Sequence, residues 1–119
     1  MSSEPRTWVI RIRHILEAIE ESRRFIEGMS YEDFCNDPRT LKAVVWNIAT
    51  IGEASGQIPE TVRIAYPGVP WQDMRGMRNH IVHGYDRIDH EIVWNVIHDE
   101  LPPLVPLLER MLLDRSDGS

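Results

Sequence analysis

The chain has 119 residues, 42% of them hydrophobic and 27% charged, with a formal net charge of −6. This length and composition indicate one globular domain with one core and exclude a disordered chain. The acidic balance argues against a broad, non-specific nucleic-acid binder, because such proteins present basic surfaces to the phosphates.

The remaining compositional features concern compartment and cysteine chemistry. The apolar runs are only a few residues long, and the polar N-terminus carries no basic-then-apolar leader, so we expect a cytoplasmic protein without a membrane segment. The single cysteine, Cys35, excludes an internal disulfide and a multi-thiolate zinc site. We expect it to be a small buried or half-buried residue.

The first predicted element is an amphipathic helix from about Pro5 to Gly28. Its apolar residues recur at steps of four, three, four and seven, which is the spacing of one helical face: Trp8, Ile12, Ile15, Ile19 and Ile26. Ser30 then caps a short helical turn over residues 31–35.

A second helix is predicted to begin at Asp37-Pro38, where a capping acid precedes a proline in the first turn. Its core stripe consists of Leu41, Val44, Val45, Ile48, Ile51 and Gly52. A weaker second face holds Trp46, Ala49 and Glu53, so we expect contacts on two sides. Residues 59–66 indicate one or two further helical turns, followed by a loop over residues 67–70.

The third and fourth long helices complete the predicted fold. One runs from Pro70 to about His83 and stops at Gly84. The other is capped by Asp89, and Pro102-Pro103 must kink or break it. We therefore predict an all-α bundle of four long helices with short helical connectors, forming a single domain over residues 1–115 with a disordered tail over residues 116–119.

Residues 78–85 read Arg-Asn-His-Ile-Val-His-Gly-Tyr and concentrate groups that handle phosphate and protons. On a helix, Arg78 falls within the apolar stripe that also contains Trp71, Met74, Ile81 and Val82. A charge in that position needs a carboxylate, a subunit cleft or a ligand. Glu53 is the natural carboxylate, although it could equally be an ordinary surface residue.

Asn79 and His83 lie one helical turn apart, so the amide can orient the imidazole. A structural role for His83 remains open when this residue is considered alone. A metal site can be assembled from His80, His83, Asp86 and His90, but this spacing matches no standard ligand set. We therefore expect no metal and no cofactor. His14 and His98 are predicted to be surface or boundary residues.

The motif and its flanks resemble those of the HepT-like toxins of the HEPN superfamily. Arg78 is followed by four residues, His83, one residue and Tyr85, and Asn79 supplies the polar residue directly after the arginine. The similarity extends to Trp46-Asn47-Ile48, to residues 51–54 and 71–77, and to the Leu101-Pro102-Pro103-Leu104 segment. It covers nearly the whole chain.

This resemblance implies an all-α homodimer whose two motifs face each other across the interface. It further implies a metal-independent ribonuclease of a toxin–antitoxin system, with Arg78 and His83 as catalytic residues. The implied partner is an MntA-like nucleotidyltransferase antitoxin that transfers AMP to Tyr85. The residues themselves agree with this chemistry, because RNA carries its own 2′-hydroxyl nucleophile and its cleavage needs a proton-transfer group and a cation.

A different class of function stays open at this point. The chain could be a non-catalytic helical partner that binds a nucleotidyltransferase and presents Tyr85 to it. The net negative charge favours this alternative. Cleavage of RNA in EDTA separates the two hypotheses.

Overall fold

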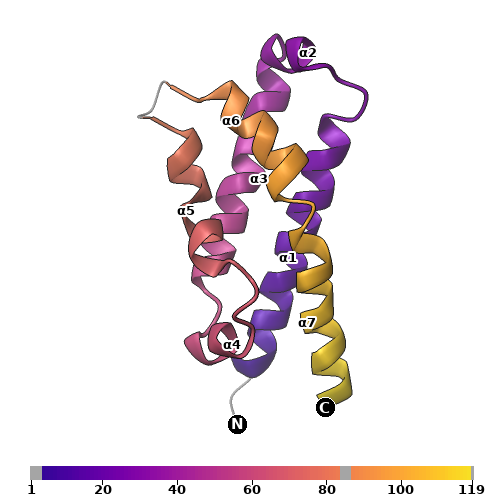
Figure 1. The fold of residues 1–119 in the computed structure, drawn as a ribbon, viewed down its shortest axis with the longest axis vertical. Helices are drawn as coiled ribbons and strands as arrows, with labels where there is room; N and C mark the ends of the chain where they lie inside the picture. Colours follow the sequence, from indigo (N-terminus) through magenta and orange to yellow (C-terminus); the bar gives the residue numbers. More distant parts are fainter. Residues whose placement is uncertain (1–3, 84–86, 119) are drawn as a thin grey trace.

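The computed structural model describes the backbone of residues 4–83 and 87–118, and these residues form an all-α bundle (Figure 1). The helices are α1 (Glu4–Phe25), α2 (Tyr31–Cys35), α3 (Pro38–Gly56), α4 (Glu60–Ala65), α5 (Trp71–Ile81), α6 (His90–Asn95), the π-helical η1 (Val96–Glu100) and α7 (Leu104–Gly118). Within these ranges the β structure is limited to one isolated bridge between Val82 and Ile88. The predicted fold class is confirmed.

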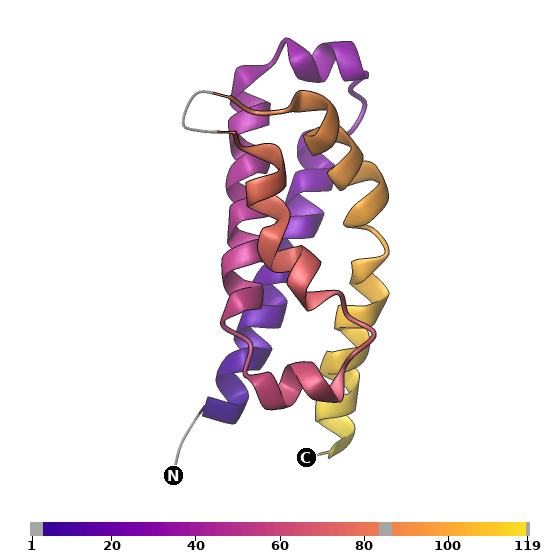
Figure 2. The ribbon, with the colours of Figure 1, turned by 60° about the vertical axis from the view of Figure 1, so that its left-hand side comes forward.

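The long helices α1, α3, α5 and α7 run alternately up and down the bundle (Figures 1 and 2). Helix α2 closes one end, and the C-terminal end of α5 and the start of α6 lie toward this same end. The start of α1 and the end of α7 lie at the opposite end, beside α4. The C-terminal end of α5, which carries Arg78, therefore lies far from the start of α1 and from the end of α7.

The predicted stop after the first long helix and the predicted caps at Ser30 and Asp37 are confirmed. Gly28, just after α1, has a φ of 81°, a left-handed conformation that favours glycine. Ser30 and Asp33 form a reciprocal capping box at α2. Asp37 accepts a hydrogen bond from the backbone N–H of Thr40, and this bond holds the pKa of the carboxyl below its usual value.

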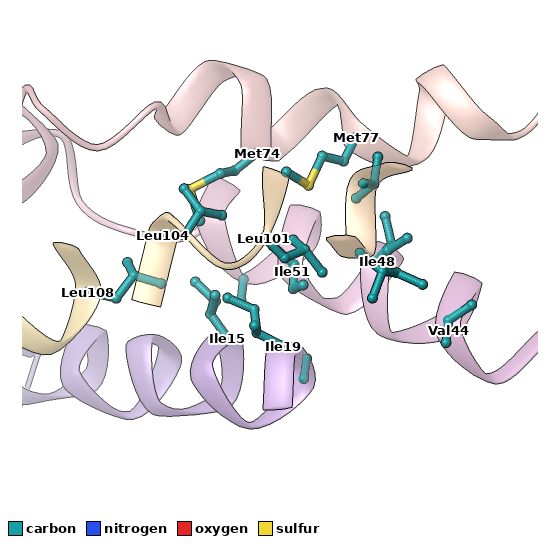
Figure 3. Close-up of a cluster of buried hydrophobic side chains, with 14 of the residues drawn as sticks. Ile15, Ile19, Val44, Ile48, Ile51, Met74, Met77, Leu101, Leu104 and Leu108 are labelled. Atoms are coloured by element: carbon teal, nitrogen blue, oxygen red, sulfur yellow. The ribbon is translucent and has the colours of Figure 1, made fainter. Parts of the chain in front are cut away.

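The core lies where the four long helices meet (Figure 3). The labelled core side chains come from α1, α3, α5 and the α7 region: Ile15, Ile19, Val44, Ile48, Ile51, Met74, Met77, Leu101, Leu104 and Leu108. These positions recur at the three- and four-residue steps predicted for each helix. The hydrophobic pattern of the sequence thus accounts for the packing.

Gly52 lies where α3 packs tightly against the backbone of α5. A Cβ atom built on Gly52 would lie 3.2 Å from the backbone oxygens of both Met74 and Arg75. A side chain here would require the α5 backbone to shift by a few tenths of an ångström, so the glycine favours the close packing of α5 against α3. Gly52 therefore positions the helix that carries Arg78.

The proline pair breaks the last predicted helix into three parts. Pro102 and Pro103 lack backbone N–H groups, and their rings collide with the carbonyl four residues earlier in a regular helix. The turn before them widens, and the N–H of Leu101 donates to the carbonyl of Val96 at 2.9 Å, five residues back. The chain then begins again as α7 at Leu104. The predicted break is confirmed.

Two expectations differ from the structure. Cys35 is exposed rather than buried, because it ends the short α2 while Phe34, which is fully buried, fills the core position of this turn. Helix α7 continues to Gly118, whereas we expected residues 116–119 to be a tail. No proline follows Pro106, so the chain carries no backbone obstacle to this extension.

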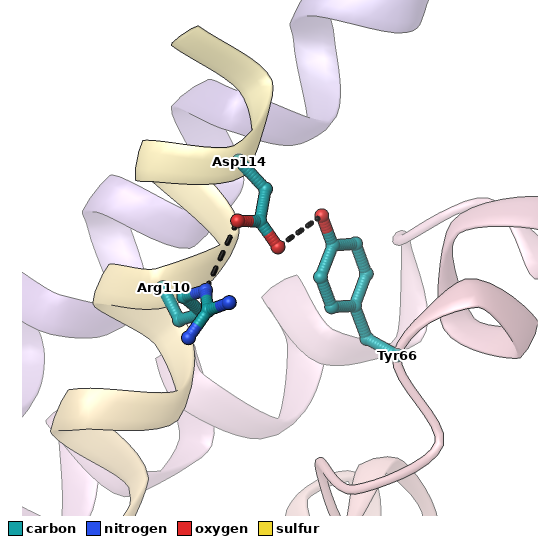
Figure 4. A network of polar contacts seen from close by, with 3 residues as sticks. All are labelled: Tyr66, Arg110 and Asp114. Atoms are coloured by element: carbon teal, nitrogen blue, oxygen red, sulfur yellow. Dashed lines mark hydrogen bonds and ion pairs between the residues drawn. The ribbon is translucent and has the colours of Figure 1, made fainter. Parts of the chain in front are cut away.

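A polar network ties the loop after α4 to α7 (Figure 4). The hydroxyl of Tyr66 donates to Asp114 at 3.3 Å, and Asp114 also accepts from Arg110 at 3.0 Å. Burial, followed by the neighbouring Asp114 carboxylate, raises the pKa of Tyr66. The protonated phenol is therefore favoured by the folded state.

This raised pKa predicts a loss of stability at alkaline pH. A group whose pKa is higher in the folded state stabilises the protein fully below its unfolded pKa of about 10, and that contribution is lost as the pH rises through the folded pKa. We expect wild type to lose more thermal stability than Tyr66→Phe between about pH 9 and pH 11. Melting temperatures of both proteins across this range test it, and parallel curves would contradict it.

Candidate nuclease site

The motif begins in the last turn of α5. This helix buries Trp71, Met74, Met77 and Ile81 against the rest of the bundle. Arg78 belongs to the same half of the helix but its side chain is exposed, so it marks the edge of the apolar stripe rather than its middle. Because the guanidinium of Arg78 is at the surface of the single chain, its charge does not require a buried carboxylate partner.

Helix α5 ends two residues earlier than the sequence predicts. Val82 is its C-cap, with extended backbone angles (φ −110°, ψ 117°), and His83 follows outside the helix. The N–H of His83 donates to the carbonyl of Arg87 at 2.7 Å, and the N–H of Asp89 donates to Ile81 at 2.9 Å. These bonds with the segment before α6 replace the next helical bonds, so the predicted helix end at His83 was wrong.

The short antiparallel pairing fixes the backbone of His83 between two helices. Its side chain is exposed. Because His83 is not in the helix, it does not sit one helical turn above Asn79, and the described residues contain no hydrogen bond between these two side chains. Gly84, Tyr85 and Asp86 lie outside the described residues, and with them the predicted glycine stop and the predicted modification site.

Three exposed arginines lie on α5 or shortly after it in the sequence: Arg75, Arg78 and Arg87. Among the side chains that the structure describes, none of these three arginines forms an ion pair with a carboxylate. The ion pair found there joins Arg110 to Asp114 on α7. Exposed guanidinium groups without carboxylate partners are suited to binding phosphate oxygens in a bidentate geometry. The concentration of arginines in this stretch of sequence contrasts with the net charge of −6 of the chain.

Glu53, the predicted partner of Arg78, is also exposed. It lines a hollow of about 300 Å³ between α1 and α3, together with Arg11, His14 and Trp46. No hydrogen bond or ion pair joins it to Arg78 within the described residues. The structure therefore does not bring these two residues together in one chain.

Asn79 is exposed and lines a second groove, of about 500 Å³, between α5 and the α6–η1 segment. The sequence places Gln72 and Gly76 on the same helical face as Asn79, and both line this groove. His80 lines this groove as well, although it was predicted only as part of the polar stretch 78–85 and as one of four possible metal ligands. The helical spacing could have predicted this location, because His80 lies four residues after Gly76 and therefore on the same side of the helix.

The described residues contain neither a cluster of metal ligands nor a membrane-spanning helix. No group of three histidine, cysteine, aspartate or glutamate side chains is arranged to hold a metal ion. His14 and His98 are both exposed, as predicted. Among residues 4–83 and 87–118, none of the helices is long and apolar enough to span a membrane.

Comparison with known proteins adds independent information about the whole chain. A family model described as "Ribonuclease HepT-like" matches residues 15–111. A protein named "Probable ribonuclease HepT" from Thermococcus cleftensis is 33% identical over 100 residues, covering 84% of this chain and 91% of that protein. A protein from Caldanaerobacter subterraneus, named as a candidate RNase, is 34% identical over 101 residues and covers 85% and 90% of the two chains.

A protein named as a candidate RNase from Methanocaldococcus jannaschii is 33% identical over 100 residues, which is 84% of this chain and 83% of that relative. No solved structure matches the chain. The family model spans more than half of the sequence and includes α3, α5 and residues 78–85. The chain belongs to the HepT-like ribonuclease family.

Proposed function

We propose that the chain is a metal-independent endoribonuclease in which Arg78 and His83 act on the RNA backbone. The observation that carries this proposal is the exposed, unpaired Arg78 at the end of α5, followed by an exposed His83 whose backbone is held against the segment before α6. The ribonuclease names of the relatives support the same activity.

The proposed reaction uses the 2′-hydroxyl of RNA as the nucleophile. This oxygen attacks the adjacent phosphorus and loses its proton, while the bond to the 5′-oxygen breaks and that oxygen gains a proton. His83 serves as a proton-transfer group for these steps. Arg78 binds the phosphate oxygens and stabilises the negative charge that develops on them in the transition state.

Cleavage of single-stranded RNA by the purified protein in EDTA tests this function. The proposal expects full activity, because neither proton transfer nor charge stabilisation is assigned to a metal. The alternative of a non-catalytic binding partner for a nucleotidyltransferase expects intact RNA. The net charge of −6 favours that alternative, whereas the unpaired arginines on α5 favour catalysis.

The proposal includes a homodimer in which the two motifs face each other. Trp46 on α3 supports an interface, because 74% of its side chain is exposed and large exposed aromatic residues are enriched where proteins associate. It borders the hollow that also contains Glu53. A dimer would cover this indole and would bring two sets of arginine and histidine together.

We expect sedimentation to show a dimer at micromolar concentration. Trp46→Ala should weaken dimerisation at least ~30-fold, since a buried tryptophan anchor contributes about 2 kcal/mol or more. Ile64→Ala is a matched control, because Ile64 is 67% exposed but lies on α4 at the other end of the bundle. A wild-type monomer at this concentration would contradict the proposed dimer.

We also propose that the chain is the cytoplasmic toxin of a toxin–antitoxin pair, whose MntA-like nucleotidyltransferase transfers AMP to Tyr85. The added phosphate would be bound by Arg78 and would compete with the RNA phosphate for this cation. Inhibition by this route leaves the bundle folded.

Co-expression with the cognate nucleotidyltransferase should increase the intact mass by AMP units and abolish RNA cleavage. Both effects should be absent in Tyr85→Phe and retained in Tyr31→Phe, which removes the hydroxyl of a tyrosine outside the motif that is 40% exposed. Peptide mapping should place the adduct on Tyr85. Full neutralisation with an unchanged mass would instead mean that the antitoxin covers the site.

A further inference from the structure

Gly76 occupies the middle of α5 without a packing reason. A Cβ atom built on it would have no heavy atom within 4 Å outside its own helix backbone, whereas a Cβ on Gly52 would lie only 3.2 Å from two backbone oxygens of α5. A glycine inside a helix costs stability relative to alanine, because it loses more conformational freedom on folding. The packing of the chain explains Gly52 and leaves Gly76 without an explanation.

The missing side chain leaves a hollow on the helix surface. Gln72, Asp73, Asn79 and His80 surround Gly76, since they lie three and four residues before and after it. The hollow continues toward α6 and η1 and forms the groove of about 500 Å³ described above. The apolar side of this groove is made by Met77, Ile92 and Val96, and Glu100 lies at its far edge.

These groups fit a nucleobase better than a phosphate. The carboxylates of Asp73 and Glu100 repel phosphate oxygens but accept hydrogen bonds from amino groups. The amides of Gln72 and Asn79 offer both a donor and an acceptor, the combination that pairs with the edge of adenine, and a carboxylate can accept from the amino group of cytosine. The apolar side provides contact for the flat face of the base.

The groove lies directly beside the proposed phosphate-binding residues. Asn79 follows Arg78 in the sequence, and Arg75 precedes Gly76, so the cationic and polar faces of α5 share an edge. A nucleotide whose phosphate binds the arginines therefore has its base within reach of the groove. Gly76 then allows the base to approach the helix backbone.

We propose that this groove binds the base of a nucleotide next to the scissile phosphate and favours bases with an exocyclic amino group over uracil. This inference rests on the proposed ribonuclease function, since it assigns a specificity pocket to the same site. The occupant is single-stranded RNA, because a base within a duplex does not expose its pairing edge to such a groove.

The test separates binding from cleavage. Short 2′-O-methyl oligonucleotides lack the nucleophile, so fluorescence anisotropy with labelled oligo-A, oligo-C and oligo-U measures binding alone. Wild type should bind the A and C oligomers at least fivefold more tightly than the U oligomer. Gly76→Leu fills the hollow and should weaken binding to the A and C oligomers at least fivefold, to the level of the U oligomer, which removes the preference.

The controls address folding and location. Gly76→Ala should fold and melt at or above the wild-type temperature, because the added methyl group enters open space. Gly68→Leu adds the same side chain to another glycine without neighbours within 4 Å, in the loop before α5, and should bind like wild type. Glu100→Gln should reduce the preference for oligo-C over oligo-U, because it removes a carboxylate that can accept from the cytosine amino group without filling the groove.

The outcomes distinguish this inference from the proposed function. Unchanged binding in Gly76→Leu, with RNA still cleaved by wild type, overturns the nucleobase pocket and leaves the ribonuclease standing. Loss of base preference in Gly76→Leu, without any cleavage of unmodified RNA by wild type, supports the pocket and overturns the ribonuclease. If Gly76→Leu instead changes the oligomeric state with unchanged RNA binding, a second copy occupies the groove and the inference is wrong.

Discussion

Alanine at Arg78 or His83 should lower the rate of RNA cleavage by at least ~100-fold, which is the usual loss when a proton-transfer group or a charge-stabilising donor is removed. Both side chains are exposed in the single chain, so melting temperatures should stay within about 2 °C of wild type. Quantitative cleavage of a labelled RNA in EDTA, with thermal melting of each variant, measures both effects.

Three comparisons sharpen this result. Arg78→Lys keeps the charge but loses the bidentate fork, so it should recover only part of the activity. Arg23→Ala and His98→Ala remove the same residue types at exposed positions of α1 and η1 and should cleave like wild type. Full activity in Arg78→Ala and His83→Ala would refute the catalytic assignment, and a large drop in melting temperature would assign these residues a structural role.

Gly52→Leu should produce the largest loss of stability among the single substitutions discussed. Its side chain must begin 3.2 Å from two backbone oxygens of α5, and backbone cannot rotate away as a side chain can. Overpacking of this kind costs about 3 kcal/mol. For a domain of this size the melting temperature should fall by roughly 10–20 °C.

Gly56→Leu provides the matched comparison on the same helix, one turn later. A Cβ on Gly56 would meet the side chain of Arg75, with its Nε at 3.4 Å, and this long exposed side chain can move. Thermal melting should therefore show only a small shift for Gly56→Leu. Similar losses in both variants would mean that α5 tolerates displacement from α3, contrary to the packing described above.

The helices were predictable because their signals are local. Asp37-Pro38 marks the start of α3 through a cap that needs only the next few residues, and the isoleucine spacing of α1 defines its buried face. Pro102-Pro103 likewise breaks a helix through its own ring geometry. In each case the residues that determine the helix start, the buried face or the break belong to that same segment of the chain.

The end of α5 was not predictable in this way. Ile81, Val82 and His83 can continue a helix, and nothing within them forbids it. The helix ends because the segment from Arg87 to Asp89 supplies alternative hydrogen bonds to Ile81 and His83, and these partners lie outside the helix. The relation predicted between Asn79 and His83 failed for the same reason.

The exposure of single residues also depends on tertiary structure. Helical spacing placed Arg78 beside the buried Met74 and Ile81, but only the position of α3 decides where the covered face of α5 ends. Phe34 occupies the inward position of α2, which leaves Cys35 outside. Periodicity identifies the buried face of a helix and does not fix its edges.

The pairing that holds His83 has a consequence for how the imidazole is ordered. Its backbone is fixed by a hydrogen bond to Arg87, while its exposed ring has no hydrogen bond to another described side chain. Ordering one such side chain on binding costs about 0.5–1.5 kcal/mol of rotamer entropy. RNA therefore has to complete the alignment of the ring itself, so part of its binding free energy is used to build the reactive arrangement.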